Sequence, residues 1–393
     1  MVKNYLRIII ITFLLLWVPI SALTEKSLLV IKGGEIHTIS AGVIQDGMIF
    51  LENGKIRSVG KNISIPKGAR IIDADGLIVT PGIIDARSRF SLRVPRRSKN
   101  FFNSARKAID FFKPVEESTW LKCGVTATYI TPPAQDLLGG FGAVVKLVGG
   151  KEEAVVSDAA GMSVSFGESA LKGLNTPTTR QGRVGRLRQE FVRANEYKEL
   201  GKKGAETETA DPQYEAILRV LSREVPLRVF ANNPDDIMTS LRFAKEFNLR
   251  IVIDSGAAAH RVARFLAKAQ VPVVVGPSIM GLGSGGPLEM IAHTPENAGR
   301  LYRAGVKVAL STDSRGGRSV LSEGVIAKSH GLPEDIALRA VTLSAAEILG
   351  VADRLGSIEP GKDADIIIWK GHPLNTWGET RIVIVSGKVV YER

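Results

Sequence analysis

Short apolar runs separated by turn residues mark both ends of the chain. Runs rich in Val and Ile that are joined by Asn-Gly or Gly-Gly turns are typical of β-hairpins. The pattern predicts strands within residues 27–80 and again within residues 362–393, and we expect the two ends to form one small β-sandwich domain. The predicted strands are Leu28–Ile31, Gly47–Leu51, Ile56–Val59, Asp365–Trp369, Arg381–Val385 and Val389–Tyr391, with turns at Gly33-Gly34, Asn53-Gly54 and Ser386-Gly387-Lys388.

Between the two ends, over residues 81–361, apolar β-type runs alternate with amphipathic helical stretches. This alternation is typical of a parallel α/β barrel, so we expect a (β/α)8 TIM-type barrel beside the β-sandwich. Residues 172–212 are more polar, and we interpret them as a helical insertion on the barrel surface. The predicted strands are Gly82–Asp85, Val125–Ile130, Leu227–Ala231, Arg250–Asp254, Val271–Gly276 and Val306–Ser311, and the predicted helices are Arg183–Leu200, Pro234–Phe247, Ala258–Lys268, Pro295–Ala304 and Pro333–Leu349.

The N-terminus has the composition of a targeting segment. Lys3 and Arg7 precede the apolar run Ile8–Val18, which leads to the small residues Ser21-Ala22. This order is typical of a secretory signal peptide, and the run is short for a membrane-spanning helix. We therefore predict that residues 1–22 are a signal peptide and that the protein is exported, to the periplasm or the extracellular space. The alternative is an uncleaved segment that anchors the protein in a membrane.

The composition is that of a globular protein with a basic charge balance. The 393 residues are 44% hydrophobic and 23% charged, and the formal net charge of +12 favours anionic partners. The cations are spread along the chain apart from one dense run, Arg87–Lys99, and no nucleic-acid-binding motif accompanies that run. We therefore expect no nucleic-acid partner, and we expect membrane contact only if the N-terminal segment stays uncleaved.

The most specific motif is the sequence PGIID at Pro81–Asp85, where the predicted barrel begins. Three later segments accompany it, and they are Val308–Ser314, Ala340–Gly350 and Arg354–Asp365. Together these segments resemble the amidohydrolase superfamily, in particular its exported, imidazolonepropionase-like members. The resemblance covers nearly the whole chain beyond the predicted signal peptide. It implies a TIM barrel and hydrolysis of non-peptide C–N bonds with zinc or another divalent metal.

The positions that the resemblance assigns to the metal hold different residues in this chain. Arginine carries only hydrogen-bond donors and stays protonated, so it cannot ligate a cation. A lone aspartate with amide and hydroxyl neighbours cannot hold a transition metal, and we therefore expect no cofactor. Arg87 and Arg89 stand at the first two histidine positions, Phe230, Asn232 and Ser255 stand at the later ones, and Asp313 is the one expected ligand that is kept.

A guanidinium in the place of the metal would neutralise a carboxylate that is otherwise buried alone. We predict that Arg87 or Arg89 forms an ion pair with Asp313, which is then either vestigial or a general base. Asn232 and Ser255 join the two arginines as predicted binding residues at the positions of the lost ligands.

Two other features carry no predicted chemistry. The glycine-rich stretch Gly139–Gly142 is interpreted as a structural turn, and Lys146 follows it in an apolar run without an assigned role.

Two functions follow from these residues, and whether the protein is an enzyme stays open. The first is a degenerate, metal-free pseudoenzyme that acts as a binding or partner protein, with an anionic small molecule at the barrel mouth or an active paralogue in a hetero-oligomer. The alternative is an active hydrolase of cyclic amides or dipeptide-like substrates, which uses Asp313 as general base and an arginine in place of the metal.

Overall fold

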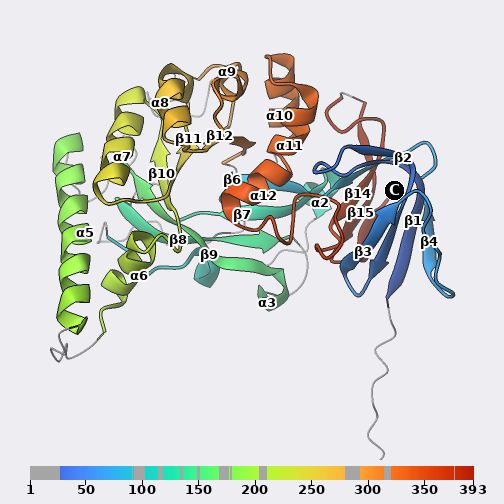
Figure 1. The fold of residues 1–393 in the computed structure, drawn as a ribbon, viewed down its shortest axis with the longest axis horizontal. Coiled ribbons are helices and arrows are strands. Elements are labelled where there is room, and N and C mark those ends of the chain that lie inside the picture. The colour runs from blue at the N-terminus through green and yellow to red at the C-terminus, as the bar shows by residue number, and fades with distance from the viewer. Residues whose placement is uncertain are drawn as a thin grey trace, which may run out of the picture.

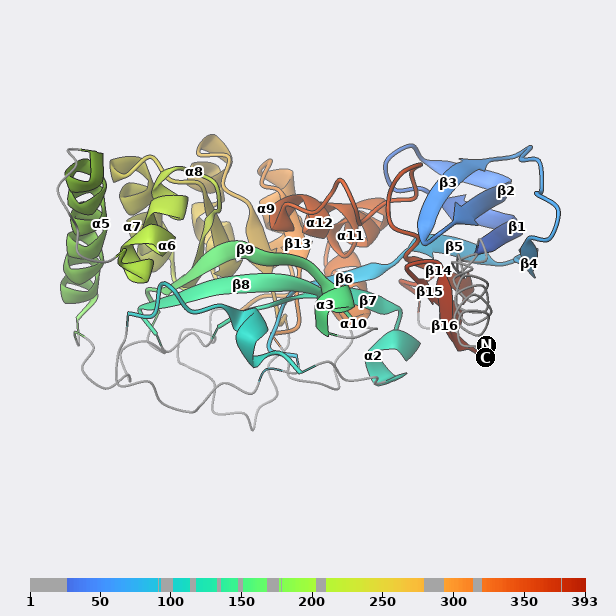
Figure 2. The same cartoon turned by 90° about the horizontal axis from the view of Figure 1, so that it is seen from below.

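The structure is a computed structural model that describes residues 27–90, 92, 102–113, 118–132, 136–147, 151–167, 177, 179–202, 210–278, 293–313, 320–375 and 377–393. The predicted signal peptide lies outside these residues. Figures 1 and 2 show the barrel strands with a layer of helices along one side and a separate sheet beside them. Within the described residues, no helix combines the length and the apolarity that crossing a bilayer requires.

Both ends of the chain contribute to one hydrogen-bonded sheet with its own core. Antiparallel pairing of β5 with β14, for example Pro81 with Ile366, joins the two ends. The order is β16-β15-β14-β5-β1-β2-β3, and β4 pairs with β1. The strands are β1 (Leu28–His37), β2 (Val43–Glu52), β3 (Lys55–Gly60), β4 (Arg70–Asp73), β5 (Ile78–Pro81), β14 (Ile366–Lys370), β15 (Glu379–Val385) and β16 (Lys388–Glu392).

The turns predicted for this sheet have different outcomes. Asn53-Gly54 connects β2 to β3 and Ser386-Gly387 connects β15 to β16, as predicted. The turn predicted at Gly33-Gly34 is wrong, because both residues lie inside β1. Gly33 has a φ of +85°, and the register between β1 and β2 shifts there. The glycine therefore allows an irregularity inside the strand instead of a turn between strands.

The predicted TIM-type barrel is confirmed as a nearly closed sheet of eight strands in the order of the sequence. The first and last strands meet where the backbone N–H of Asp313 donates to the carbonyl of Arg87 at 3.0 Å. One strand, β8, runs antiparallel to both of its neighbours. The strands are β6 (Ile83–Ser88), β7 (Val125–Ile130), β8 (Leu138–Lys146), β9 (Val155–Ser165), β10 (Leu227–Ala231), β11 (Ile251–Ser255), β12 (Val273–Val275) and β13 (Val308–Leu310).

The interpretation of Gly139–Gly142 as a turn is wrong, because these residues lie in β8. A Cβ atom on Gly140 would lie 2.2 Å from the carbonyl oxygen of Arg106, and one on Gly142 would lie 2.1 Å from the hydroxyl of Tyr129. The glycines therefore allow other parts of the chain to approach the strand closely.

Helices cover the outer side of the barrel (Figure 1). The polar region interpreted as an insertion, residues 172–212, contains α5 and ends at the first residue of α6, and both helices lie in the connection from β9 to β10. The helix α5 packs on α7 through Phe191 and Phe243, whose ring centroids lie 5.1 Å apart. The helices are η1 (Ala108–Phe111), α2 (Ser118–Lys122), α3 (Lys151–Ala154), α5 (Arg180–Lys202), α6 (Pro212–Leu221), α7 (Pro234–Glu246), η2 (Ala259–Val262), α8 (Ala263–Lys268), α9 (Asn297–Arg303), α10 (Val320–Ser329), α11 (Glu334–Ala340) and α12 (Leu343–Leu349).

The single helix predicted at Pro333–Leu349 is wrong, because the structure divides it into α11 and α12. The break falls at Thr342, whose backbone leaves the helical region and whose hydroxyl donates to the carbonyl of Leu338 at 2.7 Å. A threonine hydroxyl that bonds to the backbone competes with regular helix geometry.

Candidate functional site

The barrel brings the carboxyl ends of β6, β10, β11 and β13 to one face, where active sites of such barrels are built. Arg87 lies near the end of β6, and Asp313 follows β13 after two residues. Because β6 and β13 meet where the barrel closes, these two residues come together from opposite ends of the barrel sequence.

Asp313 is held by both Arg87 and Arg89. Arg87 Nη1 lies 2.5 Å from Asp313 Oδ1, and Arg89 Nε lies 3.5 Å from the same oxygen. Arg89 Nη2 also donates to the backbone carbonyl of Asp313 at 3.1 Å. The Arg87 side chain is 3% exposed, whereas that of Arg89 is 40% exposed. The buried guanidinium therefore needs the carboxylate, and the outer one keeps access to solvent.

A second ion pair lies deeper in the barrel, between neighbouring strands β10 and β11. Arg228 contacts Asp254 with both ends of its fork, Nη2 to Oδ1 at 2.5 Å and Nε to Oδ2 at 3.0 Å. Arg87 Nε lies 3.8 Å from Asp254 Oδ2, so Asp254 connects the two buried guanidiniums. The guanidinium of Arg228 lies 3.9 Å from the ring centroid of Tyr129, and that of Arg87 lies 4.7 Å from the ring centroid of Phe230.

The pKa values of this network follow from burial and charge. Burial alone would lower the pKa of Arg228, but Asp254 and Tyr129 together raise it above its ordinary value. Burial also raises the pKa of the Tyr129 hydroxyl to about 12. Arg228 and Tyr129 therefore keep their protons at any physiological pH.

Asp85, from the PGIID motif, is a buried residue that connects the first barrel strand to the segment after the last one. Its Oδ1 accepts from the backbone N–H of Arg87 at 3.2 Å and of Thr312 at 3.1 Å, and its Oδ2 accepts from the Thr312 hydroxyl at 2.5 Å. Burial raises its pKa to about 7, although the Thr312 hydrogen bonds oppose the shift. Asp85 thus fastens the end of β6 to the segment after β13.

Asn232 and Ser255 lie at the ends of the neighbouring strands β10 and β11, and both are buried. Asn232 Oδ1 accepts from the backbone N–H of Ala257 at 3.2 Å, while its Nδ2 has no partner among the described residues. Ser255 and Asp313 adopt left-handed backbone conformations with φ of +72° and +45°. Such conformations cost roughly 1–3 kcal/mol each and cluster at functional sites, which supports the barrel mouth as the candidate site.

The residues at the barrel mouth do not fit the divalent metal that the resemblance implies. Within the described ranges, no group of three His, Cys, Asp or Glu side chains is placed to hold a metal ion. The Asp313 oxygen that a metal would need already contacts Arg87. A divalent cation about 4 Å from a guanidinium would be repelled by roughly 8 kcal/mol at an effective dielectric constant of about 20.

Lys146 belongs to the opposite end of the barrel. Because β8 is antiparallel, its last residue lies beside the start of β7, and Lys146 pairs there with Ala127. Its ammonium group lies 2.9 Å from both Asp363 Oδ2 and Asp365 Oδ1. Lys146 therefore joins the barrel to the sheet formed by the chain ends and takes no part in the mouth.

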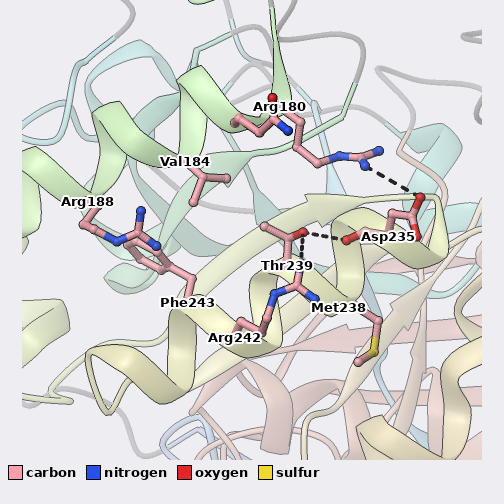
Figure 3. Close-up of a pocket in the computed structure, with 9 residues that line it drawn as sticks. Arg180, Val184, Arg188, Asp235, Met238, Thr239, Arg242 and Phe243 are labelled. Carbon is pink, nitrogen blue, oxygen red and sulfur yellow. Dashed lines mark hydrogen bonds and ion pairs between the residues drawn. The ribbon is translucent and has the colours of Figure 1, made fainter.

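A cavity of about 510 Å³ lies between α5 and α7, away from the barrel mouth (Figure 3). Two of the arginines that line it have acidic partners, because Arg180 contacts Asp236 and Arg188 contacts Glu246. These pairs hold the two helices together, and none of the candidate residues of the mouth lines the cavity.

Arg228 and Asp254 were not predicted from the sequence as part of the site. The signal lies in the strands themselves, since each is a buried apolar run that carries one charged residue of opposite sign. In the register of β10 with β11, Arg228 pairs with Val252 and Phe230 pairs with Asp254, so the two charges are diagonal neighbours on one face. This register is visible only in the folded sheet.

The fold and site place the protein among TIM-barrel proteins with a companion sheet made from both chain ends. The chain is 33% identical in sequence to an amidohydrolase from Thermotoga maritima whose crystal structure is known. The two structures match with a TM-score of 0.85, over 93% of this chain and 100% of that one. The pattern of the family described as "Amidohydrolase family" matches residues 287–390. The chain belongs to the amidohydrolase family, as the resemblance predicted.

Curated relatives are more distant. The chain is 25% identical to the amidohydrolase tasK of Hapsidospora irregularis over 392 residues, which cover 88% of this chain but only 40% of tasK. It is 24% identical to an imidazolonepropionase of Geobacillus kaustophilus over 391 residues, which cover 84% of each protein. Hydrolases are thus among the relatives of this protein, at low identity.

Proposed function

We propose that this protein is a metal-free member of the amidohydrolase family whose barrel mouth binds an anionic small molecule. The observation that supports the proposal is the contact of 2.5 Å between Arg87 and Asp313, with the Arg87 side chain 3% exposed. A buried cation stands where the resemblance expects a metal, and it already forms an ion pair with the carboxylate. The chemistry of the mouth is then recognition by guanidinium groups.

The charge balance of the mouth favours an anion. Three guanidiniums, those of Arg87, Arg89 and Arg228, face Asp254 and Asp313. Asp85, the third acid of this network, has a pKa raised to about 7 by burial, so below that pH it is mainly protonated and these six groups together carry one positive charge in excess. Arg89 is the most exposed of the three, and its planar fork suits a carboxylate or a phosphate.

Metal content tests the first half of the proposal. We expect purified protein that is incubated with zinc and manganese and then desalted to retain far less than one metal ion per chain, as measured by elemental mass spectrometry. Near-stoichiometric retention that is lost in Asp313→Ala would contradict the proposal and indicate a metal centre at the mouth.

Thermal shift tests the second half. A ligand at a hundred times its dissociation constant stabilises the folded state by about 2.7 kcal/mol, which fluorimetry resolves easily. We expect succinate or phosphate to raise the melting temperature, and we expect Arg89→Gln to abolish the rise. Arg57→Gln, at a side chain 71% exposed on β3, is the matched control and should leave the rise unchanged. No rise with any anion would refute anion binding.

The alternative function is that of an active hydrolase, and observed hydrolysis would favour it. Turnover of cyclic amides or dipeptides by the metal-free protein, lost in Asp313→Asn, would show that Asp313 and an arginine act without metal. Export and association with an active paralogue stay predictions. The mass of the mature protein tests the first, because cleavage after Ala22 removes the basic and apolar N-terminal segment.

A further inference from the structure

The outer faces of α8 and α9, with the preceding η2, carry a concentration of positive charge. Figure 1 shows the two helices in the layer outside the barrel, and η2 contacts α9. We name this the α8–α9 surface. Its exposed residues are Arg261, Arg264, Phe265, Lys268, Arg300, Tyr302 and Arg303.

The spacing of these residues puts the charges on one side. Arg264 and Lys268 are four residues apart and lie on one face of α8, and Arg261 belongs to η2 directly before that helix. The opposite faces are apolar, and Leu266 of α8 and Leu301 of α9 are fully buried. The cations therefore face outward because the other side packs on the barrel.

The two helices present their charges close together. His260 Nδ1 lies 3.2 Å from Asn297 Oδ1, which connects η2 to the first turn of α9. Burial lowers the pKa of His260, and the charges of Arg300 and Arg261 lower it further. Both arginines therefore act on the same imidazole from different helices.

Few acids balance this charge. In residues 256–278 and 293–312, the only acidic residue is Glu296. Elsewhere the structure pairs its surface arginines, for example Arg188 with Glu246 and Arg219 with Glu224. No ion pair with a described acid involves Arg261, Arg264, Lys268, Arg300 or Arg303. Arg303 contacts the carbonyl of Gly331 instead.

We propose that the α8–α9 surface docks on an anionic lipid bilayer. Phe265 is 38% exposed and Tyr302 is 39% exposed, one on each helix, among the cations. Aromatic rings beside lysine and arginine suit the headgroup region, where the rings enter the interface and the cations meet phosphates. Each cation held near such a surface contributes about fivefold to the binding constant. The proposal is independent of what the barrel mouth binds, and it replaces the expectation from the sequence that membrane contact needs an uncleaved N-terminal segment.

Vesicle flotation tests the proposal with the full chain. We expect binding to phosphatidylcholine vesicles that contain about a third phosphatidylglycerol, no binding to pure phosphatidylcholine, and release when salt is raised, because screening weakens surface electrostatics. The triple variant Arg261→Glu, Arg264→Glu and Lys268→Glu should bind at least a hundredfold more weakly.

The control has the same change in net charge on another face. It is Arg57→Glu, Lys61→Glu and Lys67→Glu, at exposed positions on or after β3. We expect it to bind like the unmodified chain, and circular dichroism should show both variants folded. Binding to neutral vesicles, or binding that the α8–α9 reversal leaves unchanged, would overturn the proposal. The proposal would also be overturned if the chain bound duplex DNA as strongly as anionic vesicles and the same charge reversal abolished that binding. The surface would then be a nucleic-acid site.

Discussion

Replacing Arg228 with methionine isolates the contribution of the buried ion pair to the stability of the barrel. Arg228 has no exposed surface, and Asp254 is 3% exposed. Methionine fills much of the volume of the arginine stem, so the substitution removes charge with little loss of packing. Among the described cationic side chains, Asp254 then keeps only Arg87, whose Nε lies 3.8 Å away.

The cost follows from burial and geometry. Removing one partner of a buried pair leaves an uncompensated charge and destabilises proteins by roughly 3–5 kcal/mol. Arg228 Nη2 also donates to the carbonyl of Ala86 at 3.1 Å, and losing a hydrogen bond of this kind costs about 1 kcal/mol more. The remaining attraction of Arg87 for Asp254 offsets part of this, and we expect a loss of about 4 kcal/mol in the free energy of unfolding.

Urea unfolding followed by circular dichroism measures this loss, and the chain offers a matched control. Arg188 and Glu246 form the same fork geometry at 2.5 and 2.8 Å, but their side chains are 44% and 39% exposed. Because solvent screens this pair, Arg188→Met should cost less than about 1 kcal/mol. Adding Asp254→Leu to Arg228→Met should recover more than about 2 kcal/mol, since both buried charges are then removed together.

Two results would refute the reasoning. If Arg228→Met lowers the free energy of unfolding by no more than Arg188→Met does, burial does not increase the contribution of the ion pair to stability. If the double variant loses the sum of the two single losses, the two residues are not coupled and their contact has no energetic role.

Three further predictions concern other buried positions. Burial raises the pKa of Asp85 from 3.8 to about 7. The unfolded chain therefore releases this proton first, and roughly 4 kcal/mol of stability that is present below pH 3.8 is lost as the pH rises to about 7. Asp85→Asn should remove this decrease in the free energy of unfolding between pH 4 and pH 8, as measured by urea unfolding at each pH. If the variant shows the same decrease as the unmodified chain, the prediction is wrong. Lys146→Met should cost about 3–5 kcal/mol in urea unfolding, because it leaves Asp365 buried without its ammonium partner, and a loss below 1 kcal/mol would argue against this role. Gly124→Ala should lower the melting temperature, since Gly124 has a φ of +76° and the new Cβ would lie 2.5 Å from the ring of Trp369, whereas an unchanged melting temperature would show that this contact relaxes freely.

Periodicity alone was enough to predict the architecture of most of the chain. Six of the eight barrel strands were predicted, because parallel barrel strands are short apolar runs bounded by helical stretches. The strand β8 was missed because its glycines resemble a turn in a one-dimensional pattern, and they are instead sites of close approach by Arg106 and Tyr129. The helix break at Thr342 was missed for a similar reason, since the competing hydrogen bond of its hydroxyl is a local detail that amphipathic spacing does not reveal.

The sequence by itself determined that this is an amidohydrolase-type barrel, because motifs and side-chain chemistry are properties of single residues and short segments. That arginines stand at two expected metal positions is a prediction from the same motifs. Only the tertiary structure decided which charges meet. It brought Arg87 to Asp313 across the closure of the barrel and set Arg228 against Asp254 through the strand register. Charge pairing depends on distances of a few ångströms between residues far apart in the chain, and only the packed fold sets those distances.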